Sequence, residues 1–245
     1  IAMVFFVASC AACMTIGNQR LNPVREPELP VKSFLHFEVS LVEKAGSLEL
    51  NTPISSCSAF SVLSGKGGTI GITNFHCVKV QPSVYASLLG NQKLQLKRAV
   101  RTSDNKLHDI QLLRTNKASD LAAFLVPDIK IKGIPVYTGT LKRGEPVWSI
   151  GTPRSFLNYK DGYGTVPIQT GVFNGLIRTG TVTQSLFTLP IAGGSSGSPI
   201  LILNGDRYEL VGVLSSMWSM GHYKDLSNGV SMKQLHSFIK HLIRP

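Results

Sequence analysis

Short extended segments dominate the pattern of apolar and polar positions along most of the chain. The segment FLHFEVSLV alternates between apolar and polar residues, and compact apolar runs between Gly, Pro, Asn and Ser follow it. Alternation with a period of two predicts strands with one buried face, and short apolar runs between turn residues favour buried strands. We therefore predict about a dozen short strands. They fall within the segments 34–42, 57–65, 66–78, 93–102, 108–115, 121–127, 146–153, 168–180, 183–191 and 199–216.

The last third of the chain carries two stronger local signals. Asn204-Gly205, inside the run PILILNGDRYELVGVLSS, is a dipeptide typical of the tight turn in a hairpin. The final segment 231–245 places apolar residues at helical spacing, which predicts a C-terminal helix. These residues are Leu235, Phe238, Ile239 and Leu242. Many short strands followed by one helix favour an all-β fold, either a double barrel or a sandwich.

Residues 1–17, IAMVFFVASCAACMTIG, form an apolar leader that is shorter than the roughly 20 residues of a membrane span. The leader fits the apolar and cleavage parts of an export signal, and we expect it to be incomplete because no basic residue precedes it. Cys10, in the run VASC, resembles the lipid-accepting cysteine of a bacterial lipobox. Signal peptide, lipoprotein and short membrane anchor all predict an exported or membrane-associated protein. A piece of a viral polyprotein is the alternative.

Residues 18–33 are polar, contain three prolines and predict a linker, which leaves 34–245 as one domain. Hydrophobic residues make up 43% of the chain and charged residues 16%, which excludes a disordered protein. The net charge of +11 includes one cluster with few aromatic residues and no nucleic-acid motif. We interpret this cluster as a solvated surface and predict no specific nucleic-acid partner. Its members are Lys93, Lys97, Arg98, Arg101 and Lys106.

The run IAGGSSGSPILI at 191–202 holds three serines among glycines and raises the question of a nucleophile. A serine hydroxyl needs a base to take its proton and a third group to orient that base. Among the six histidines, His76 directly follows an apolar strand. Asp120 opens the buried segment SDLAAFLV, whereas most other aspartates lie in turn-like runs. The cysteines show no zinc-ligand spacing, so we predict neither a metal nor a cofactor.

Three motifs, in this order, resemble those of trypsin-like serine peptidases. ITNFHCV around His76 is similar to the family's histidine motif, SDLAAFLV to the Asp-Leu-Ala strand of its HtrA-type branch, and GSSGSP to its nucleophile motif. LKRGEPVWSIGTP resembles another HtrA-type segment, and the likeness runs from about residue 56 to 215. The resemblance implies two six-stranded β-barrels of chymotrypsin type with a C-terminal α-helix. It also implies a catalytic triad of His76, Asp120 and Ser196.

The resemblance extends to the surroundings of the nucleophile. It implies an oxyanion hole made by the N–H groups of Gly194 and Ser196, with Gly194 at a positive φ. It also implies a disulfide between Cys57 and Cys77. Because Ser195 rather than an aspartate precedes the nucleophile, we expect no activation by a newly exposed N-terminal amine.

The likeness places the walls of the primary specificity pocket in FTLPIA and LSSM, neither of which carries a charge. A charged side chain would find no partner there, so we expect a small to medium apolar residue before the cut. Ser215 falls near the position from which a serine of the family supports the catalytic aspartate. The residues expected to bind substrate are Leu189, Pro190, Ile191, Leu214, Ser215 and Ser216.

The main prediction is a serine endopeptidase that cleaves protein or peptide substrates through an acyl-enzyme. Three other interpretations stay open. Residues 193–197 also fit the nucleophile elbow of α/β-hydrolases with Ser195 as nucleophile, although a strand-like run follows instead of a helix. A Gly/Ser loop without chemistry is the second interpretation. The third is a catalytically silent trypsin-like binding module whose basic surface contacts an acidic polymer or a membrane.

Overall fold

A computed structural model describes residues 27–45, 48–79, 95–127, 129–151, 167–220 and 223–243. The predicted leader 1–17, including Cys10, lies outside these residues, and so does Lys93 of the basic cluster. Of the predicted linker, only residues 27–33 are described. None of the helices within the described ranges combines the length and the apolar character that crossing a membrane requires.

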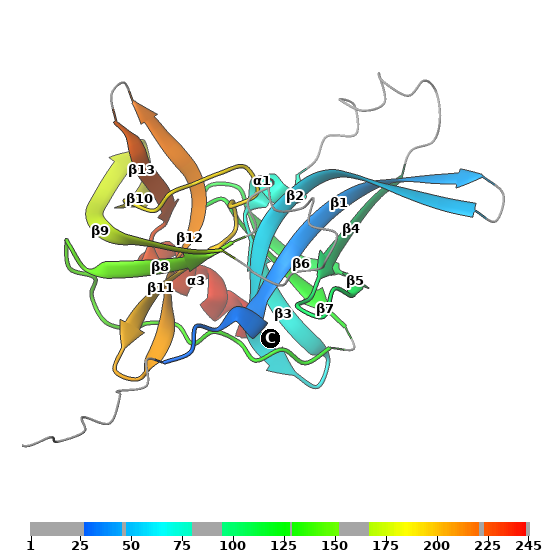
Figure 1. Cartoon of the computed structure of the whole chain (residues 1–245), viewed down its shortest axis with the longest axis horizontal. Helices are drawn as coiled ribbons and strands as arrows, with labels where there is room; N and C mark the ends of the chain where they lie inside the picture. Colours follow the sequence, from blue (N-terminus) through cyan, green and yellow to red (C-terminus); the bar gives the residue numbers. More distant parts are fainter. Residues whose placement is uncertain are drawn as a thin grey trace, which may run out of the picture.

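The N-terminal half of the protein is a seven-stranded antiparallel sheet in the order β5-β4-β1-β2-β3-β7-β6. The strands β5 and β6 stand at opposite ends of this order, yet only Ile110 separates them in the chain. The chain therefore brings the two ends of the sheet together, and the half is barrel-like (Figure 1). Its elements are η1 (Val31–Ser33), β1 (Phe34–Ala45), β2 (Leu48–Gly65), β3 (Gly68–Thr73), α1 (Phe75–Val78), β4 (Gln95–Arg101), β5 (Leu107–Asp109), β6 (Gln111–Asn116) and β7 (Leu121–Val126).

The C-terminal half is a closed barrel in the order β10-β13-β12-β11-β8-β9. Asn204 and Arg207 face each other across its β11–β12 hairpin, and Gly205 between them has a φ of 64°. Its elements are β8 (Pro146–Ile150), β9 (Ile168–Thr179), β10 (Val182–Phe187), β11 (Pro199–Asn204), β12 (Arg207–Met220), β13 (Tyr223–Val230) and the helix α3 (Met232–Ile243).

Three apolar clusters hold the molecule together. One fills the N-terminal half around Phe37 and Phe124, and one fills the C-terminal barrel around Phe187. The third joins Phe60 of β2 and residues of both halves to the buried face of α3, which contributes Leu235, Phe238 and Ile239. The apolar residues that predicted the helix thus belong to the cluster through which the two halves pack against each other.

The structure confirms the all-β fold with two barrel-like halves and one C-terminal helix. It also confirms the predicted helix and the hairpin turn at Asn204-Gly205. The N-terminal half has seven strands instead of the expected six, because the chain between β4 and β7 is interrupted at Ile110 and forms two short strands. This arrangement puts the loops at the ends of both halves next to each other, and the candidate active site is built from them.

Candidate active site

The single helical turn α1 presents His76 at the surface of the N-terminal half. Its neighbours Cys77 and Val78 are buried, whereas the side chain of His76 is 49% exposed. The turn is tied to the segment before β7, because the N–H of Phe75 donates to the carbonyl of Asp120 at 3.1 Å. The amide Nδ2 of Asn74 donates to the same carbonyl at 3.0 Å. These bonds fix the backbone on either side of the imidazole.

Asp120 holds the imidazole at two points. Its carboxylate accepts the backbone N–H of His76 on Oδ1 at 3.0 Å and the ring nitrogen Nδ1 on Oδ2 at 2.8 Å. An ionised carboxylate can only accept, so the proton of this bond belongs to Nδ1. The other ring nitrogen, Nε2, then carries the lone pair, as a general base requires.

The backbone of Asp120 has an unusual conformation, with φ at 52° in a region that residues other than glycine seldom occupy. The turn before it is closed by the Asp120 N–H, which donates to the carbonyl of Lys117 at 3.3 Å. Ser119 donates its own N–H to Oδ1 of Asn116 at 3.2 Å. The residues 116–120 therefore form a compact turn that aims the carboxylate at α1.

The hydroxyl of Ser215 on β12 supplies a further bond to Asp120, donating to Oδ2 at 2.6 Å. Burial alone would raise the pKa of Asp120, but the hydrogen bonds from His76 and Ser215 outweigh burial and hold this pKa below its ordinary value. The carboxylate is thus ionised at neutral pH. Because Ser215 belongs to the C-terminal half, this bond also crosses between the two halves.

Ser196 lies in the turn that leads into β11. Its hydroxyl donates to the carbonyl of Ser215 at 3.0 Å. Among the described residues, no hydrogen bond joins this hydroxyl to the ring of His76, but both side chains line the same pocket. Hydrogen bonds between a nucleophile and its base are often long or poorly aligned before substrate binds.

The backbone around Ser196 is shaped by two glycines with positive φ, Gly194 at 96° and Gly197 at 86°. The carbonyl of Ser195 accepts from the N–H of Ser198 at 3.1 Å. In a planar trans peptide the N–H points opposite to the carbonyl, so the N–H of Ser196 points away from Ser198. Among the described residues, the N–H groups of Gly194 and Ser196 have no hydrogen-bond acceptor.

The strand β2 of the N-terminal half supports this turn through Ser58, which is fully buried. The N–H of Ser58 donates to the carbonyl of Ser196 at 2.7 Å, and its hydroxyl donates to the carbonyl of Gly194 at 2.9 Å. A side chain on Gly197 would collide with the carbonyl of Ser58 and with Oγ1 of Thr73. The turn that carries Ser196 is therefore packed tightly against the N-terminal half.

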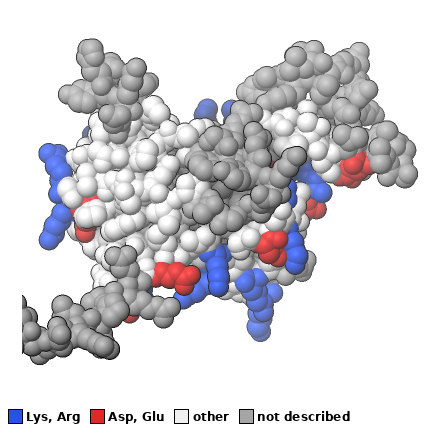
Figure 2. All heavy atoms as spheres, viewed as in Figure 1, with Lys and Arg blue, Asp and Glu red and all other residues white. Residues whose placement is uncertain are grey.

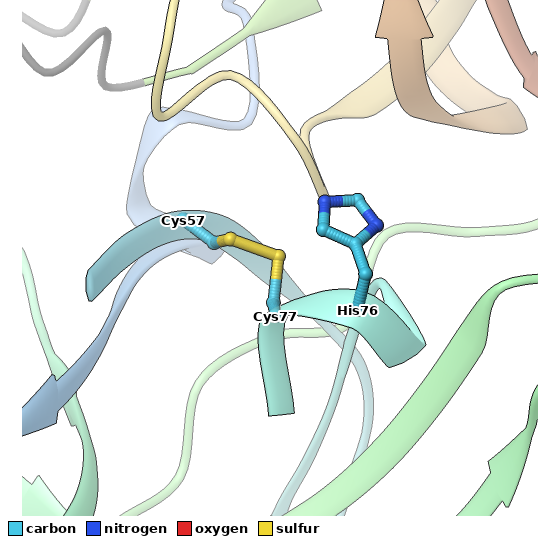
Figure 3. Close-up of side chains that lie close together, drawn as sticks. All are labelled: Cys57, His76 and Cys77. Atoms are coloured by element: carbon cyan, nitrogen blue, oxygen red, sulfur yellow. A yellow bond between two sulfur atoms is a disulfide. The ribbon is translucent and has the colours of Figure 1, made fainter. Parts of the chain in front are cut away.

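Cys57 and Cys77 form a disulfide beside His76, as the resemblance implied (Figure 3). It joins β2, next to Ser58, to the turn that carries the imidazole. The two sulfur atoms and a ring nitrogen of His76 lie within 4.8 Å of one another. Since the sulfur atoms are bonded to each other, neither is available as a thiolate ligand for a metal.

A pocket of about 660 Å³ opens over these residues. Ile191, Ser215 and Ser216 of the predicted substrate-binding set line it. The structure does not bring the other three there: Leu189 and Leu214 are buried in the core of the C-terminal barrel, and Pro190 is exposed away from the pocket. The full lining is His76, Lys117, Asp120, Ile191, Ala192, Gly193, Ser196, Ser215, Ser216 and Met217.

The sequence did not point to Lys117, Gly193 or Ser58, and Ala192 and Met217 were expected only as parts of the FTLPIA and LSSM walls. Lys117 could have been found from its place three residues before Asp120, since a turn that presents an aspartate also presents its neighbours. Met217 ends the LSSM segment that was expected opposite the specificity wall. No pattern in the sequence marks Ser58, because its role depends on contacts across the two halves.

The family model of the trypsin-like peptidase domain matches residues 57–213. The chain belongs to this family and has a serine protease-type fold. The match begins at the first cysteine of the disulfide and ends in β12, and it includes all the residues of the predicted triad. No curated protein matches the chain.

Proposed function

We propose that this protein is a serine endopeptidase in which His76, Asp120 and Ser196 act as the triad. The observation that carries the proposal is the geometry at His76, where Asp120 holds Nδ1 at 2.8 Å and leaves Nε2 to act as a base. The same pocket exposes the hydroxyl of Ser196. The hydrogen bonds from His76 and Ser215 keep Asp120 ionised beside the imidazole, which is the charge state that this role requires.

The reaction follows from these positions. Rotation of one side-chain bond moves the Ser196 hydroxyl from the Ser215 carbonyl toward His76. The oxygen attacks the peptide carbonyl carbon while Nε2 takes its proton, and Asp120 stabilises the imidazolium that forms. When the C–N bond breaks, the proton passes to the leaving amine. Water then attacks the acyl carbon while Nε2 takes its proton, and this proton passes to Oγ of Ser196 as the ester bond breaks and the acid product leaves.

The N–H groups of Gly194 and Ser196 are proposed to stabilise the oxyanion. Their lack of acceptors among the described residues supports this role, because the neighbouring N–H groups of Ser195, Gly197 and Ser198 each bond to a carbonyl. Loss of one such donor costs roughly 3 kcal/mol of transition-state stabilisation in enzymes of this kind. The hydroxyl of Ser58 helps to fix this turn through the carbonyl of Gly194.

The preference for a small or medium apolar residue before the cut is also a proposal. Its support is the uncharged wall made by Ile191, Ala192 and Met217. The single basic lining residue, Lys117, is exposed on the turn before Asp120. Peptides that differ only before the scissile bond would test this preference, with Ala, Val or Leu expected to give a higher kcat/KM than Lys or Glu.

Labelling by a fluorophosphonate probe tests the nucleophile. The wild-type protein should be labelled, and Ser196→Ala should lose labelling and at least about 10⁴-fold of its peptidase rate while folding normally. Ser216→Ala is the matched control, because this exposed serine lines the same pocket and should keep the label. Labelling that persisted in Ser196→Ala would refute the assignment.

The rival proposal, a silent binding module with a basic surface, finds less support. Within the described part of the cluster, Lys97 pairs with Asp109 at 3.1 Å, Arg101 with Glu38 at 2.8 Å and Lys106 with Asp104 at 3.1 Å. Figure 2 shows basic and acidic side chains interspersed on the face it displays. Cations that already have carboxylate partners attract a polyanion weakly. Salt-dependent binding measured beside a peptidase assay would separate the two proposals.

An exported or envelope location also remains our proposal. The Cys57–Cys77 disulfide supports it, because disulfides persist in oxidising compartments.

A further inference from the structure

A second cavity, of about 1110 Å³, lies apart from the active-site pocket and shares no lining residue with it. We call it the helix groove. It is bounded by β6 and the 116–120 turn, the connection 138–141, the strands β9 and β10, and the helix α3. The groove thus runs over the junction between the two halves.

The charges that line the helix groove all have one sign. Its charged side chains are Arg114 of β6 and Lys233 of α3, and no carboxylate lines it among the residues that the structure describes. Among the described residues, neither Arg114 nor Lys233 forms an ion pair. In this respect they differ from Lys97, Arg101 and Lys106 of the basic cluster, which have carboxylate partners. Arg114 also lies 5.8 Å from the centre of the Phe238 ring, which directs its guanidinium along the groove wall.

The groove is apolar as well as basic. Leu176 of β9 is 64% exposed there, and Phe173 and Val182 also line it. At the 116–120 turn, Ser119 is 93% buried and its hydroxyl has no hydrogen-bond partner. A uniformly charged polymer would pair with Arg114 and Lys233 but would leave Leu176 exposed. A polypeptide offers carboxylates, apolar side chains and backbone groups together.

We propose that the helix groove binds an acidic polypeptide segment that carries apolar side chains. Its carboxylates pair with Arg114 and Lys233, and its apolar side chains cover Leu176. The proposal rests on the proposed function in one respect only, namely that occupation of the groove alters catalysis.

The link to the active site is the 116–120 turn, which is shared between the two cavities. Asn116, Ala118 and Ser119 line the groove, whereas Lys117 and Asp120 line the active-site pocket. A segment bound against Ser119 is therefore one residue away from the carboxylate that orients His76. Ordering this turn changes how firmly Asp120 is held and so changes the rate of the chemical step.

Binding is tested in the Ser196→Ala protein, which cannot cleave the probe. A fluorescent twelve-residue peptide of alternating Glu and Leu is titrated by anisotropy, beside the same peptide with Gln in place of Glu. The Glu peptide should bind more tightly than the Gln peptide. The double variant Arg114→Gln/Lys233→Gln should weaken it about tenfold, because each exposed ion pair contributes under about 1 kcal/mol.

The matched control is Lys66→Gln/Lys130→Gln, which removes two exposed cations from outside the groove and should change binding less than about twofold. Equal weakening by both double variants would overturn the site, since it would indicate attraction to net charge alone. Equal binding of the Gln peptide would also overturn it, as would tighter binding of a single-stranded oligonucleotide of the same charge.

The coupling is tested in the wild-type enzyme with a short fluorogenic substrate. The Glu peptide should change kcat by at least about twofold, and the Arg114→Gln/Lys233→Gln variant should lose this response. A rise in KM alone would mean competition at the active-site pocket and would overturn the coupling, as would an unchanged kcat. If the wild type hydrolyses nothing, the proposed function fails, while the binding result in Ser196→Ala still decides the groove.

Discussion

The two halves of the molecule contribute different things to the site. The N-terminal half supplies His76 and Asp120, two side chains held by hydrogen bonds to each other and to nearby backbone. The C-terminal half supplies the hydroxyl of Ser196, the free N–H groups of its turn and the pocket walls. The groups proposed to transfer the proton and the groups proposed to meet the substrate thus come from different halves, and the site forms only when the halves pack against each other.

The cores of the halves differ as well. The apolar cluster of the C-terminal barrel consists of aliphatic and aromatic side chains. Among the described residues, each half buries a glutamate, Glu38 and Glu209, but the buried histidine, His36, belongs to the N-terminal half, in the same sheet that carries the disulfide. Burial of ionisable groups makes stability depend on pH. We therefore expect acid to weaken the N-terminal half first.

The largest expected effect comes from breaking the His–Asp pair. Asp120→Asn should lower kcat by about 10⁴-fold, because an amide donor facing Nδ1 favours the wrong tautomer of His76. Steady-state kinetics on a peptide substrate measures the loss. Asp109→Asn is the control, since this exposed carboxylate pairs only with Lys97. A loss of less than tenfold in Asp120→Asn would show that the pair does not carry catalysis.

The next largest effect is expected on the pH dependence of stability, and it comes from the buried imidazole of His36. Burial lowers its pKa from 6.5 to about 4, with Glu38 opposing the shift and Arg101 adding to it. The unfolded chain therefore takes up this proton near pH 6.5 and the folded protein only near pH 4, so stability falls as the pH falls through this window. The free energy of unfolding should drop by about 1.4 kcal/mol per pH unit, or about 3 kcal/mol in all.

Urea unfolding at several pH values measures this slope. His36→Gln should flatten it, whereas His241→Gln, which removes an exposed histidine of α3, should leave it unchanged. An equal slope in both variants would show that other groups control acid stability.

The smallest effect concerns the hydroxyl that joins the two halves at Asp120. Ser215→Ala should lower kcat/KM by about tenfold, the value of one hydrogen bond to a charged acceptor. It should also raise the pKa of Asp120, because that bond helps to keep it low, and an NMR titration of the carboxyl carbon measures this rise. Ser103→Ala, which removes an exposed hydroxyl from outside the pocket, should do neither. An unchanged pKa of Asp120 in Ser215→Ala would contradict the bridging role.

The architecture could be predicted from the sequence better than the lining of the pocket, and the catalytic triad stays a prediction. Strand alternation, the Asn204-Gly205 turn and the apolar face of α3 are local signals, and the structure follows them. His76 could be singled out because it follows a buried strand, and Asp120 because it precedes one. The bond between Asp120 and Ser215 depends on the packing of the two halves, which no local pattern contains.

The specificity residues were harder to predict for a geometric reason. The pairing of β12 with β13 shifts register between Leu214 and Ser216. This irregularity breaks the period of two, so Leu214 and Ser215 are both buried while Ser216 and Met217 are both exposed. A reader of the sequence cannot see a bulge. The partners of the basic cluster were hidden for a similar reason, since Glu38 comes from a strand far away in the chain.

Ser58 offers a way to observe assembly of the site directly. Its amide proton is buried and is shared with the carbonyl of Ser196, one residue of each half. Exchange of this proton with deuterated solvent requires the serine turn to leave β2. The exchange rate at Ser58 therefore reports how often the serine turn separates from β2.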